Sequence, residues 1–435
     1  MKRYLIILLL SVGLYAQEFD GVGLGFAGNY GPLSRGVHAL GYNPANVAVP
    51  RNNVLELNLI GSNIQVFNNS FSYRTYQDYF VTGGKENYWD QKKKDSFLDL
   101  IPDDGWKLNS DINMNVFGLA FNNFAMAVRP VVFGRIQNSP MKDILRRLLN
   151  GDDITRDYTL NYPQILQGAA FSAVGVTLGY AYPVPIKKYV PDISFLSVGV
   201  GINYYMALGV AQVEKSQAYL KRTQYDSYET LDLHTQNSVR VSYPENATPA
   251  GKGRSYDFGI SGLYKNQWFV SLSFMNVGGK INFSTNTERV LMEETQNTTY
   301  YVDPDSSSSS FEHSVDTTLT IDPFSSGVPS FFRLGVAYYF RPNLVFTSEW
   351  KQGLNKVFGN STTPRLGLGV QYKPLRWLPL RSGISLGGNS GFIMGFGAGL
   401  DFHYISLDFS YAMKNALWPT HSEGLFLGLN LMIRI

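Results

Sequence analysis

Apolar side chains recur at every second position through several long segments of this chain. Between residues 391 and 402, one set of alternate positions holds Phe392, Met394, Phe396, Ala398, Leu400 and Phe402. The intervening positions hold Ile393, Gly395, Gly397, Gly399 and Asp401. Because successive side chains of a β-strand point to opposite faces, this pattern predicts a strand with one apolar face. A chain that repeats the pattern must fold into an extended sheet.

The same period of two recurs in residues 174–180, 332–338, 405–411 and 425–435. These segments belong to predicted strands long enough to cross a membrane at a tilt, which takes about 9 to 11 residues. Strands of soluble sandwiches usually have about five or six residues. The length therefore favours an all-β fold, a transmembrane antiparallel β-barrel, over a soluble sandwich or jelly roll. In such a barrel the apolar positions face membrane lipids and the others face the lumen.

Short turns and long connections alternate between the predicted strands. The short turns include Asn122-Asn123, Lys265-Asn266 and Arg341-Pro342-Asn343, whose residue types favour tight hairpins. The long polar connections are residues 73–111, 136–168, 210–253, 278–329 and 413–422. Membrane barrels place short turns in the periplasm and long loops outside, so the alternation predicts long extracellular loops.

The number of strands follows from a parity argument. A first count gives fifteen strands, whereas single-chain bacterial barrels carry an even number. Treating residues 53–72 as one strand with a β-bulge at Gly61 removes the excess, because the apolar phase changes there. The sequence predicts fourteen strands with both termini in the periplasm, and twelve or sixteen are the alternatives. Girdles at the membrane interfaces are indicated by four aromatic residues at predicted strand ends, Trp268, Trp350, Trp377 and Trp418.

Residues 1–16 have the features of a signal peptide. Lys2 and Arg3 precede an apolar run over residues 4–14, and Ala16 supplies a small residue for cleavage. This predicts export, and with the barrel it predicts the outer membrane of a Gram-negative-type bacterium.

Composition agrees with a membrane barrel and excludes several other classes. Charged residues make up 16% of the chain, below the roughly 25% of soluble domains. Without the signal peptide, 35 basic and 34 acidic residues remain, which gives no reason to expect a nucleic-acid partner. The absence of cysteine excludes disulfides and thiolate chemistry.

Residues 17–52 contain seven glycines and no clear spanning strand, which predicts a compact plug before a barrel over residues 53–435. Three of its runs are Gly25-Phe26-Ala27-Gly28-Asn29-Tyr30, Gly36-Val37-His38-Ala39-Leu40 and Asn43-Pro44-Ala45-Asn46. Together these runs resemble the N-terminus of the FadL superfamily of outer-membrane barrels. That superfamily includes fatty-acid transporters, hydrocarbon channels and secretion-associated barrels.

The resemblance implies a fourteen-stranded barrel plugged by an N-terminal hatch. It also implies inward transport of apolar molecules, which some members release through a gap in the wall. Asn43, Pro44 and Ala45 would be the hatch residues that match the motif. Pro44 lacks a backbone donor and Asn43 can bond within its own turn, so a rigid corner is the alternative to ligand contact. The chain departs from the barrel pattern at Ile435, where an aromatic residue is common.

The predicted lumen face mixes apolar, charged and glycine positions. Its apolar members are Phe269, Met275, Ile393, Phe426 and Met432. Its charged members are Arg129, Asp257, Arg333, Glu349, Arg365, Arg381, Asp401 and Arg434. No ring of one sign results, which disfavours an ion-selective porin. Inward glycines would leave room for the plug or ease barrel curvature. The expected binding residues are Asn43, Pro44, Ala45, Phe269, Met275, Arg333, Phe426 and Met432.

Residues 139–151 predict an amphipathic helix. Ser139-Pro140 marks its start and Asn150-Gly151 its end. Its expected role is packing over the barrel mouth, and a lid or docking helix is the alternative.

No motif indicates catalysis, a metal site or a cofactor. The five histidines are scattered, without metal-ligand spacing. Residues 383–387 match the Gly-x-Ser-x-Gly spacing around Ser385, but a hairpin follows where a nucleophile elbow requires a helix. The chain is therefore expected not to be an enzyme, and a barrel hydrolase assembled from distant strands is the remaining enzymatic hypothesis.

Two functions fit this barrel. The leading hypothesis is a plugged channel for passive uptake of small hydrophobic molecules, based on the hatch-like start and the mixed lumen. The alternative is a structural or secretion-associated barrel that binds a protein partner through residues 210–253 and 278–329.

Overall fold

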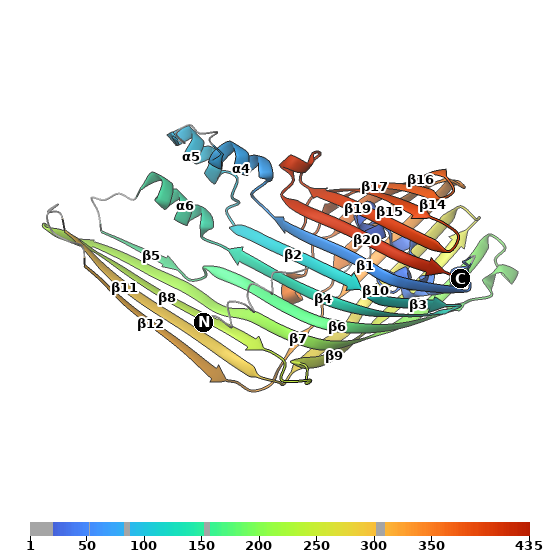
Figure 1. Cartoon of the computed structure of the whole chain (residues 1–435), viewed down its shortest axis with the longest axis horizontal. Helices are drawn as coiled ribbons and strands as arrows, with labels where there is room; N and C mark the ends of the chain where they lie inside the picture. Colours follow the sequence, from blue (N-terminus) through green and yellow to red (C-terminus); the bar gives the residue numbers. More distant parts are fainter. Residues whose placement is uncertain (1–20, 52, 82–87, 152–156, 302–308) are drawn as a thin grey trace.

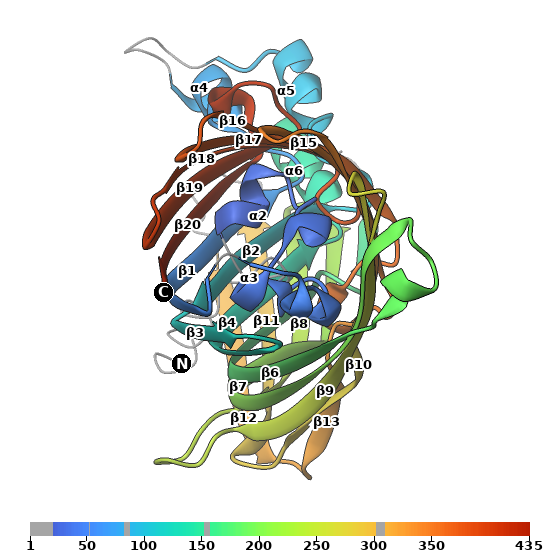
Figure 2. The ribbon, with the colours of Figure 1, turned by 90° about the vertical axis from the view of Figure 1, so that its right-hand side faces the viewer.

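The computed structural model describes residues 21–51, 53–81, 88–151, 157–301 and 309–435, and the predicted signal peptide lies outside them. The described residues form a closed antiparallel β-barrel whose wall has fourteen strand positions, as the alternation predicts (Figures 1 and 2). A closed sheet pairs its backbone groups internally, which a lipid environment requires.

Each wall position pairs with the next one along the chain. The first seven positions are β1 (Leu55–Asn68), β2 (Trp106–Asn115) continued by β3 (Phe117–Phe121), β4 (Phe124–Asn138), β6 (Leu166–Pro183), β7 (Ile193–Gln224), β9 (Gly251–Tyr264) and β10 (Trp268–Phe283). The last seven are β13 (Phe324–Gly327) continued by β14 (Phe331–Arg341), β15 (Leu344–Gly353), β16 (Arg365–Leu375), β17 (Leu378–Gly387), β18 (Ile393–Asp401), β19 (Ile405–Lys414) and β20 (Gly424–Arg434). Antiparallel pairing of β20 with β1 closes the barrel.

Outward residues of the wall are exposed apolar groups. Leu366 and Leu368 of β16 are each 59% exposed, whereas Gly367 between them faces the plug. This is the apolar-out arrangement that the period of two predicts for a lipid-facing wall. The four tryptophans expected in girdles are also exposed on the surface.

The first strand is single, as the parity argument requires, but its bulge is displaced. The register between β1 and β20 shifts between Asn58 and Ile60, so the irregularity lies at Leu59 and not at Gly61. The expected position at Gly61 was therefore wrong. Ile60 and Leu59 are both exposed, which accounts for the change of apolar phase that the sequence shows nearby.

The second wall position differs from the single strand expected over residues 112–121. It begins at Trp106 and is interrupted at Val116. Its early part was missed because the successive residues Asn109 and Ser110 are both polar and buried, which weakens the alternation.

A second sheet continues the wall beyond the barrel. β7 has 32 residues, and only its first part lies between β6 and β9. Its last part pairs with β5 (Tyr158–Tyr162) on one side and with β8 (Tyr228–Ser242) on the other. β8 pairs with β11 (Thr287–Tyr301), which pairs with β12 (Ser309–Thr320). We call β5, β7, β8, β11 and β12 the extension sheet (Figure 1).

The expectation of irregular loops at residues 210–253 and 278–329 was therefore wrong, because strands make up most of both segments. The face of the extension sheet that continues the lumen side of the wall is polar. There Arg289 donates a 2.7 Å hydrogen bond to Glu214, which raises the pKa of the guanidinium. Polar residues on both faces remove the apolar period, so the sequence pattern does not reveal these strands.

Three helices lie at the same end of the molecule (Figure 1). They are α4 (Tyr73–Phe80), α5 (Gln91–Leu98) and α6 (Met141–Asn150). The last of these confirms the predicted amphipathic helix, and Asn150 at its end accepts a 3.3 Å hydrogen bond from Gln91 of α5. Among the described residues, no helix is both long enough and apolar enough to span a membrane. Three further 3-10 turns are η3 (Ile186–Lys188), η4 (Val357–Gly359) and η5 (Pro419–His421).

Candidate functional site

Residues 21–48 fold into a plug inside the barrel (Figure 2). The plug consists of α2 (Gly21–Gly25), η1 (Gly31–Leu33), α3 (Gly36–Ala39) and η2 (Pro44–Ala48). Its large side chains, Phe26, Leu40 and Tyr42, are fully buried. The glycine-rich start therefore forms a compact helical element across the lumen and contributes no strand.

Glycines of the wall allow the plug to approach the strands closely. A Cβ at Gly259 of β9 would overlap the side-chain amide of Asn43, and one at Gly199 of β7 would overlap the backbone at Ala45. A Cβ would also overlap the backbone of the plug at three further wall glycines, Gly383, Gly395 and Gly428. These glycines lie on strands from both halves of the wall, so the plug is seated on several sides. The expectation that inward glycines leave room for a plug is confirmed at these positions.

Asn43 attaches the plug to β9 and β10. Its Nδ2 donates to Ser271 Oγ at 2.7 Å and to the carbonyl oxygen of Leu272 at 3.0 Å. Its Oδ1 accepts from the backbone N–H of Ala45 at 2.9 Å and so caps η2. Asn43, Pro44 and Ala45 are all buried in this contact. The geometry therefore favours the rigid corner over direct ligand contact at these three residues.

A buried ion pair holds the plug from the opposite half of the chain. Arg333 Nη1 of β14 lies 3.0 Å from Glu349 Oε1 of β15. Glu349 Oε2 also accepts from the backbone N–H of Gly31 at 2.8 Å. The Arg333 guanidinium lies 4.7 Å from the ring centre of Tyr42. Both charges are almost fully buried, so each depends on the other for compensation.

The remaining predicted binding residues lie on the lumen side but not at one site. Phe269 packs under the guanidinium of Arg35, 4.2 Å from its ring centre. Met275 lines a small cavity of about 30 Å³ beside the plug. Phe426 and Met432 are buried on β20. These positions mainly support the plug and the wall, and the structure does not bring them together around a ligand-sized cavity.

A larger cavity lies where the wall continues into the extension sheet. Most of its strand residues are on the outward face of the sheet, because they alternate with the inward-facing Phe133 and Phe171. Its volume is about 420 Å³. We call it the apolar pocket because most of its lining is aliphatic, alanine or glycine: Leu108, Gly134, Ile136, Ile165, Leu166, Gly168, Ala169, Ala170, Ala211, Val213, Val239 and Met292. Arg135, Ser110, Ser216, Thr235 and Asn237 complete it. Sequence reasoning missed this pocket because most of its lining falls in segments that were expected to be loops.

An aromatic cluster lies on the lumen side of β4 and β6, across the wall from most of the apolar pocket. Phe358 extends from the connection between β15 and β16, with its ring centre 4.7 Å from that of Phe133 and 5.3 Å from that of Phe171. Its φ of 48° lies in the left-handed region, which is unusual for a bulky residue. The carbonyl oxygen of Gly359 accepts a 3.0 Å hydrogen bond from Arg135, which fixes the connection across the lumen.

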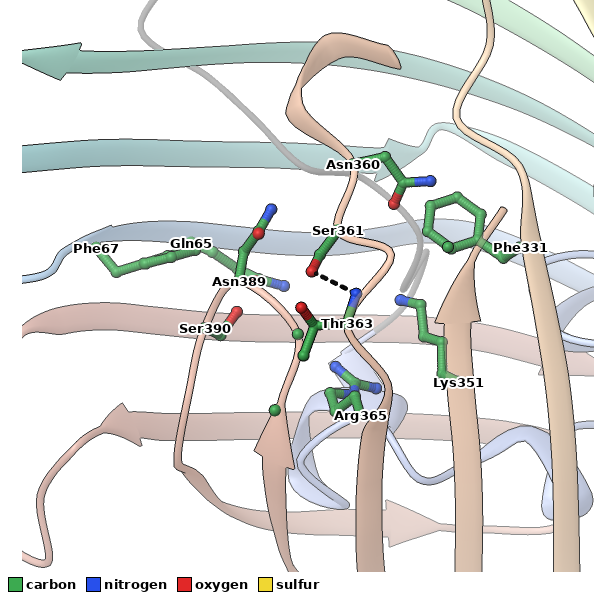
Figure 3. Close-up of a pocket in the computed structure, with 13 residues that line it drawn as sticks. Gln65, Phe67, Phe331, Lys351, Asn360, Ser361, Thr363, Arg365, Asn389 and Ser390 are labelled. Carbon is green, nitrogen blue, oxygen red and sulfur yellow. Dashed lines mark hydrogen bonds between the residues drawn. The ribbon is translucent and has the colours of Figure 1, made fainter. Parts of the chain in front are cut away.

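A second, polar cavity lies on the other side of this connection (Figure 3). Its volume is about 80 Å³. Lys351 and Arg365 line it together with hydroxyl and amide groups, and Arg365 reaches the plug through a 3.2 Å hydrogen bond to the carbonyl oxygen of Gly28. Asn389 on its rim donates a 2.8 Å hydrogen bond to the carbonyl oxygen of Gly359. The connection that carries Phe358 is therefore held from both cavities.

A protein-family model matches residues 44–408 of this chain, and its description is DUF5723, a family of unknown function. The chain belongs to this family. The DUF5723 match begins at Pro44 in the plug and ends within β19, so it includes both cavities and Phe358. No curated protein matches the chain in sequence.

Three solved structures resemble this DUF5723 chain in fold. A monoaromatic hydrocarbon channel, the TodX deltaS2S3 mutant, is 11% identical, with 95% of this chain and 97% of that chain covered and a TM-score of 0.49. A FadL homologue from Pseudomonas aeruginosa is 14% identical, with 97% of each chain covered and a TM-score of 0.46. The toluene transporter TodX from P. putida is 10% identical, with 96% and 97% covered and a TM-score of 0.45.

Proposed function

We propose that this chain is an outer-membrane barrel that admits small hydrophobic molecules by passive diffusion. The observation that carries the proposal is the apolar pocket, whose volume of about 420 Å³ suits a small organic ligand. Its few polar groups lie among aliphatic side chains, the usual composition of a site for an apolar molecule. The pocket is the proposed first binding site, and the plug is the barrier inside the barrel.

The pairing of β4 with β6 gives the order of features along the lumen. Arg135 and Ala169, which line the apolar pocket, are opposite each other on these two strands. One inward-facing pair further down is Phe133 with Phe171, where Phe358 packs. Beyond it, Arg129 lines the 30 Å³ cavity that touches the plug. A molecule moving inward meets the aromatic cluster first and the plug second.

Uptake should therefore depend on the apolar character of the pocket. Met292 lines the pocket, and its neighbour Leu291 points to the opposite, polar face of the same strand. An arginine at position 292 places a charge among apolar groups, so Met292→Arg is expected to lower uptake about tenfold or more. Leu291→Arg is the matched control and should transport like the wild type.

Proteoliposomes that contain the purified protein and are supplied with a labelled aromatic hydrocarbon would measure this difference. Uptake by the wild type equal to that of empty liposomes would contradict the proposed function. Equal loss in both arginine variants would show that the pocket is not on the route.

Removal of the Phe358 ring should speed uptake. Glycine accepts the left-handed backbone at this position without strain. The ring makes two close aromatic contacts, each worth about 0.5–1.5 kcal/mol. If displacement of the ring limits passage, Phe358→Gly should raise the initial rate about tenfold. Phe346→Ala, on the exposed outer face of β15, is the control. An unchanged rate in Phe358→Gly would remove the aromatic cluster from the route.

A further inference from the structure

β12 forms the free edge of the extension sheet (Figure 1). It pairs with β11 in one unbroken register, from Glu288 opposite Thr320 to Thr299 opposite Ser309. Within the described part of the chain, no other strand pairs with β12. Every one of its 12 residues is exposed. The strand is about twice the usual length of a strand in a globular protein.

Most of the usual protections of an edge strand are missing from β12, whose acidic residues are Glu312 and Asp316. Natural sheets block such edges with proline, lysine, bulges or a covering segment. β12 contains neither proline nor lysine, and its pairing with β11 shows no register shift. Three apolar side chains are exposed along it, Phe311 at 64%, Val315 at 41% and Leu319 at 45%. An edge of this kind is a template for another strand.

The pattern of backbone hydrogen bonds between β11 and β12 shows which backbone groups of β12 point away from the sheet. Ile321 donates its backbone N–H to the carbonyl oxygen of Thr287 at 3.0 Å, so odd-numbered residues here point their backbone groups towards β11. Even-numbered residues from Ser310 to Thr320 therefore point their N–H and C=O groups away from the sheet. The free edge offers a regular row of donors and acceptors that only an extended chain can match.

The two faces of β12 differ in chemistry. Asp316 is opposite Met292 of the apolar pocket, so Asp316 and Glu312 lie on the same face as the pocket. Phe311, Val315 and Leu319 lie on the other face. A strand added here would meet acidic residues on one face and apolar residues on the other.

We propose that the free edge of β12 binds an extended segment of a partner protein by strand addition. The segment has apolar residues on one face and basic residues on the other, which complement the two faces of β12. This partner binding is independent of the proposed uptake, because the edge does not line the apolar pocket.

A second copy of the chain fits the edge less well. Antiparallel self-pairing about Val315 would place Glu312 opposite Thr318 and Asp316 opposite Ser314, so neither carboxylate would gain a basic partner. Because the extension sheet continues the wall, such pairing would also point the two barrels in opposite directions, which one membrane does not allow. The charge pattern therefore favours a different protein with a basic face.

The defining experiment uses the full-length protein in detergent and a fluorescent peptide of alternating valine and lysine, long enough to span β12. Saturable binding by fluorescence anisotropy is expected. The same peptide with alternate backbone amides N-methylated should bind about tenfold or more weakly, because it cannot donate those hydrogen bonds. Absence of binding by the unmodified peptide, or equal binding of both peptides, would overturn the proposal.

Matched variants of the protein locate the site. Ser314→Pro removes a backbone donor that points outward, so the pairing with β11 is kept while affinity for the peptide should fall about tenfold. Ser314→Ala keeps that donor and should bind like the wild type. The double variant Glu312→Lys and Asp316→Lys reverses the charge of this face. It should bind the lysine peptide more weakly and bind a peptide with glutamate in place of lysine more tightly. Unchanged uptake by Ser314→Pro shows that the barrel is folded, and unchanged peptide affinity in that variant would count against the edge.

A cysteine variant tests the second copy directly. In a self-paired dimer the two Val315 residues would form a non-hydrogen-bonded pair with Cα atoms about 4.5 Å apart, a separation that a disulfide accepts. The chain has no other cysteine, so any crosslink in Val315→Cys has one assignment. The variant is expected to stay monomeric on mild oxidation. A disulfide-linked dimer would show that the edge binds a second copy of the chain and not a different protein.

Discussion

A Glu349→Leu variant is expected to lose about 3–5 kcal/mol of stability, because it leaves the buried Arg333 guanidinium without its carboxylate. The plug should loosen at the same time, since the backbone N–H of Gly31 loses its acceptor. The unpaired charge lies against Tyr42 of the plug. Release of the plug would let water reach the unpaired guanidinium, so release becomes more favourable. Ion conductance through the barrel should therefore rise.

Thermal unfolding and planar-bilayer conductance measure these two effects. Combining Glu349→Leu with Arg333→Met removes both charges and should restore most of the stability, because an apolar pair replaces an ion pair of similar volume. The double variant separates the cost of an unpaired charge from the loss of plug contacts. If Glu349→Leu has the same unfolding temperature and the same conductance as the wild type, the ion pair does not hold the plug.

Most of the barrel wall was predictable because its outer and inner residues obey different physical requirements. Leu366 and Leu368 face lipid, and the alternating Gly367 and Gly369 face the plug, so the contrast is visible in the sequence. The corner at Asn43 was predictable for a similar reason, because a short polar side chain before a proline suits a cap.

The extension sheet was not predictable from periodicity. In β11, Arg289 and Glu293 lie on one face and Glu288 and Glu294 on the other, so neither face is continuously apolar. The apolar pocket depends on this sheet and was missed with it. Phe358 was also missed, because it lies in a connection where no repeating pattern precedes or follows it and its partners, Phe133 and Phe171, are distant in sequence.

The plug is held by a few specific contacts at separate places. Asn43 bonds to β9 and β10, and Glu349 accepts from Gly31 near β14 and β15. Passage of a molecule requires a state in which some of these contacts are broken, and that state is populated according to their combined free energy. Weakening one contact should therefore raise the open fraction without unfolding the wall.

Gly259→Ala should displace the plug more directly than any change in the plug itself. The new Cβ would overlap the side-chain amide of Asn43 and press on the ring of Pro44. Overpacking of this kind costs about 1–3 kcal/mol, and the bonds from Asn43 to Ser271 would be lost with it. The barrel wall should still form, because a Cβ at this position faces the plug and does not interrupt strand pairing.

Limited proteolysis of the plug and conductance of the folded barrel measure the displacement, and both are expected to increase in Gly259→Ala. Gly175→Ala is the matched control, because the nearest atom to its new Cβ is 3.5 Å away, an ordinary contact. Adding Asn43→Gly to Gly259→Ala removes the clashing amide and should return the plug part-way to its place. If the plug is equally resistant to proteolysis in Gly259→Ala and Gly175→Ala, and the two barrels have equal conductance, the wall glycines do not determine the position of the plug.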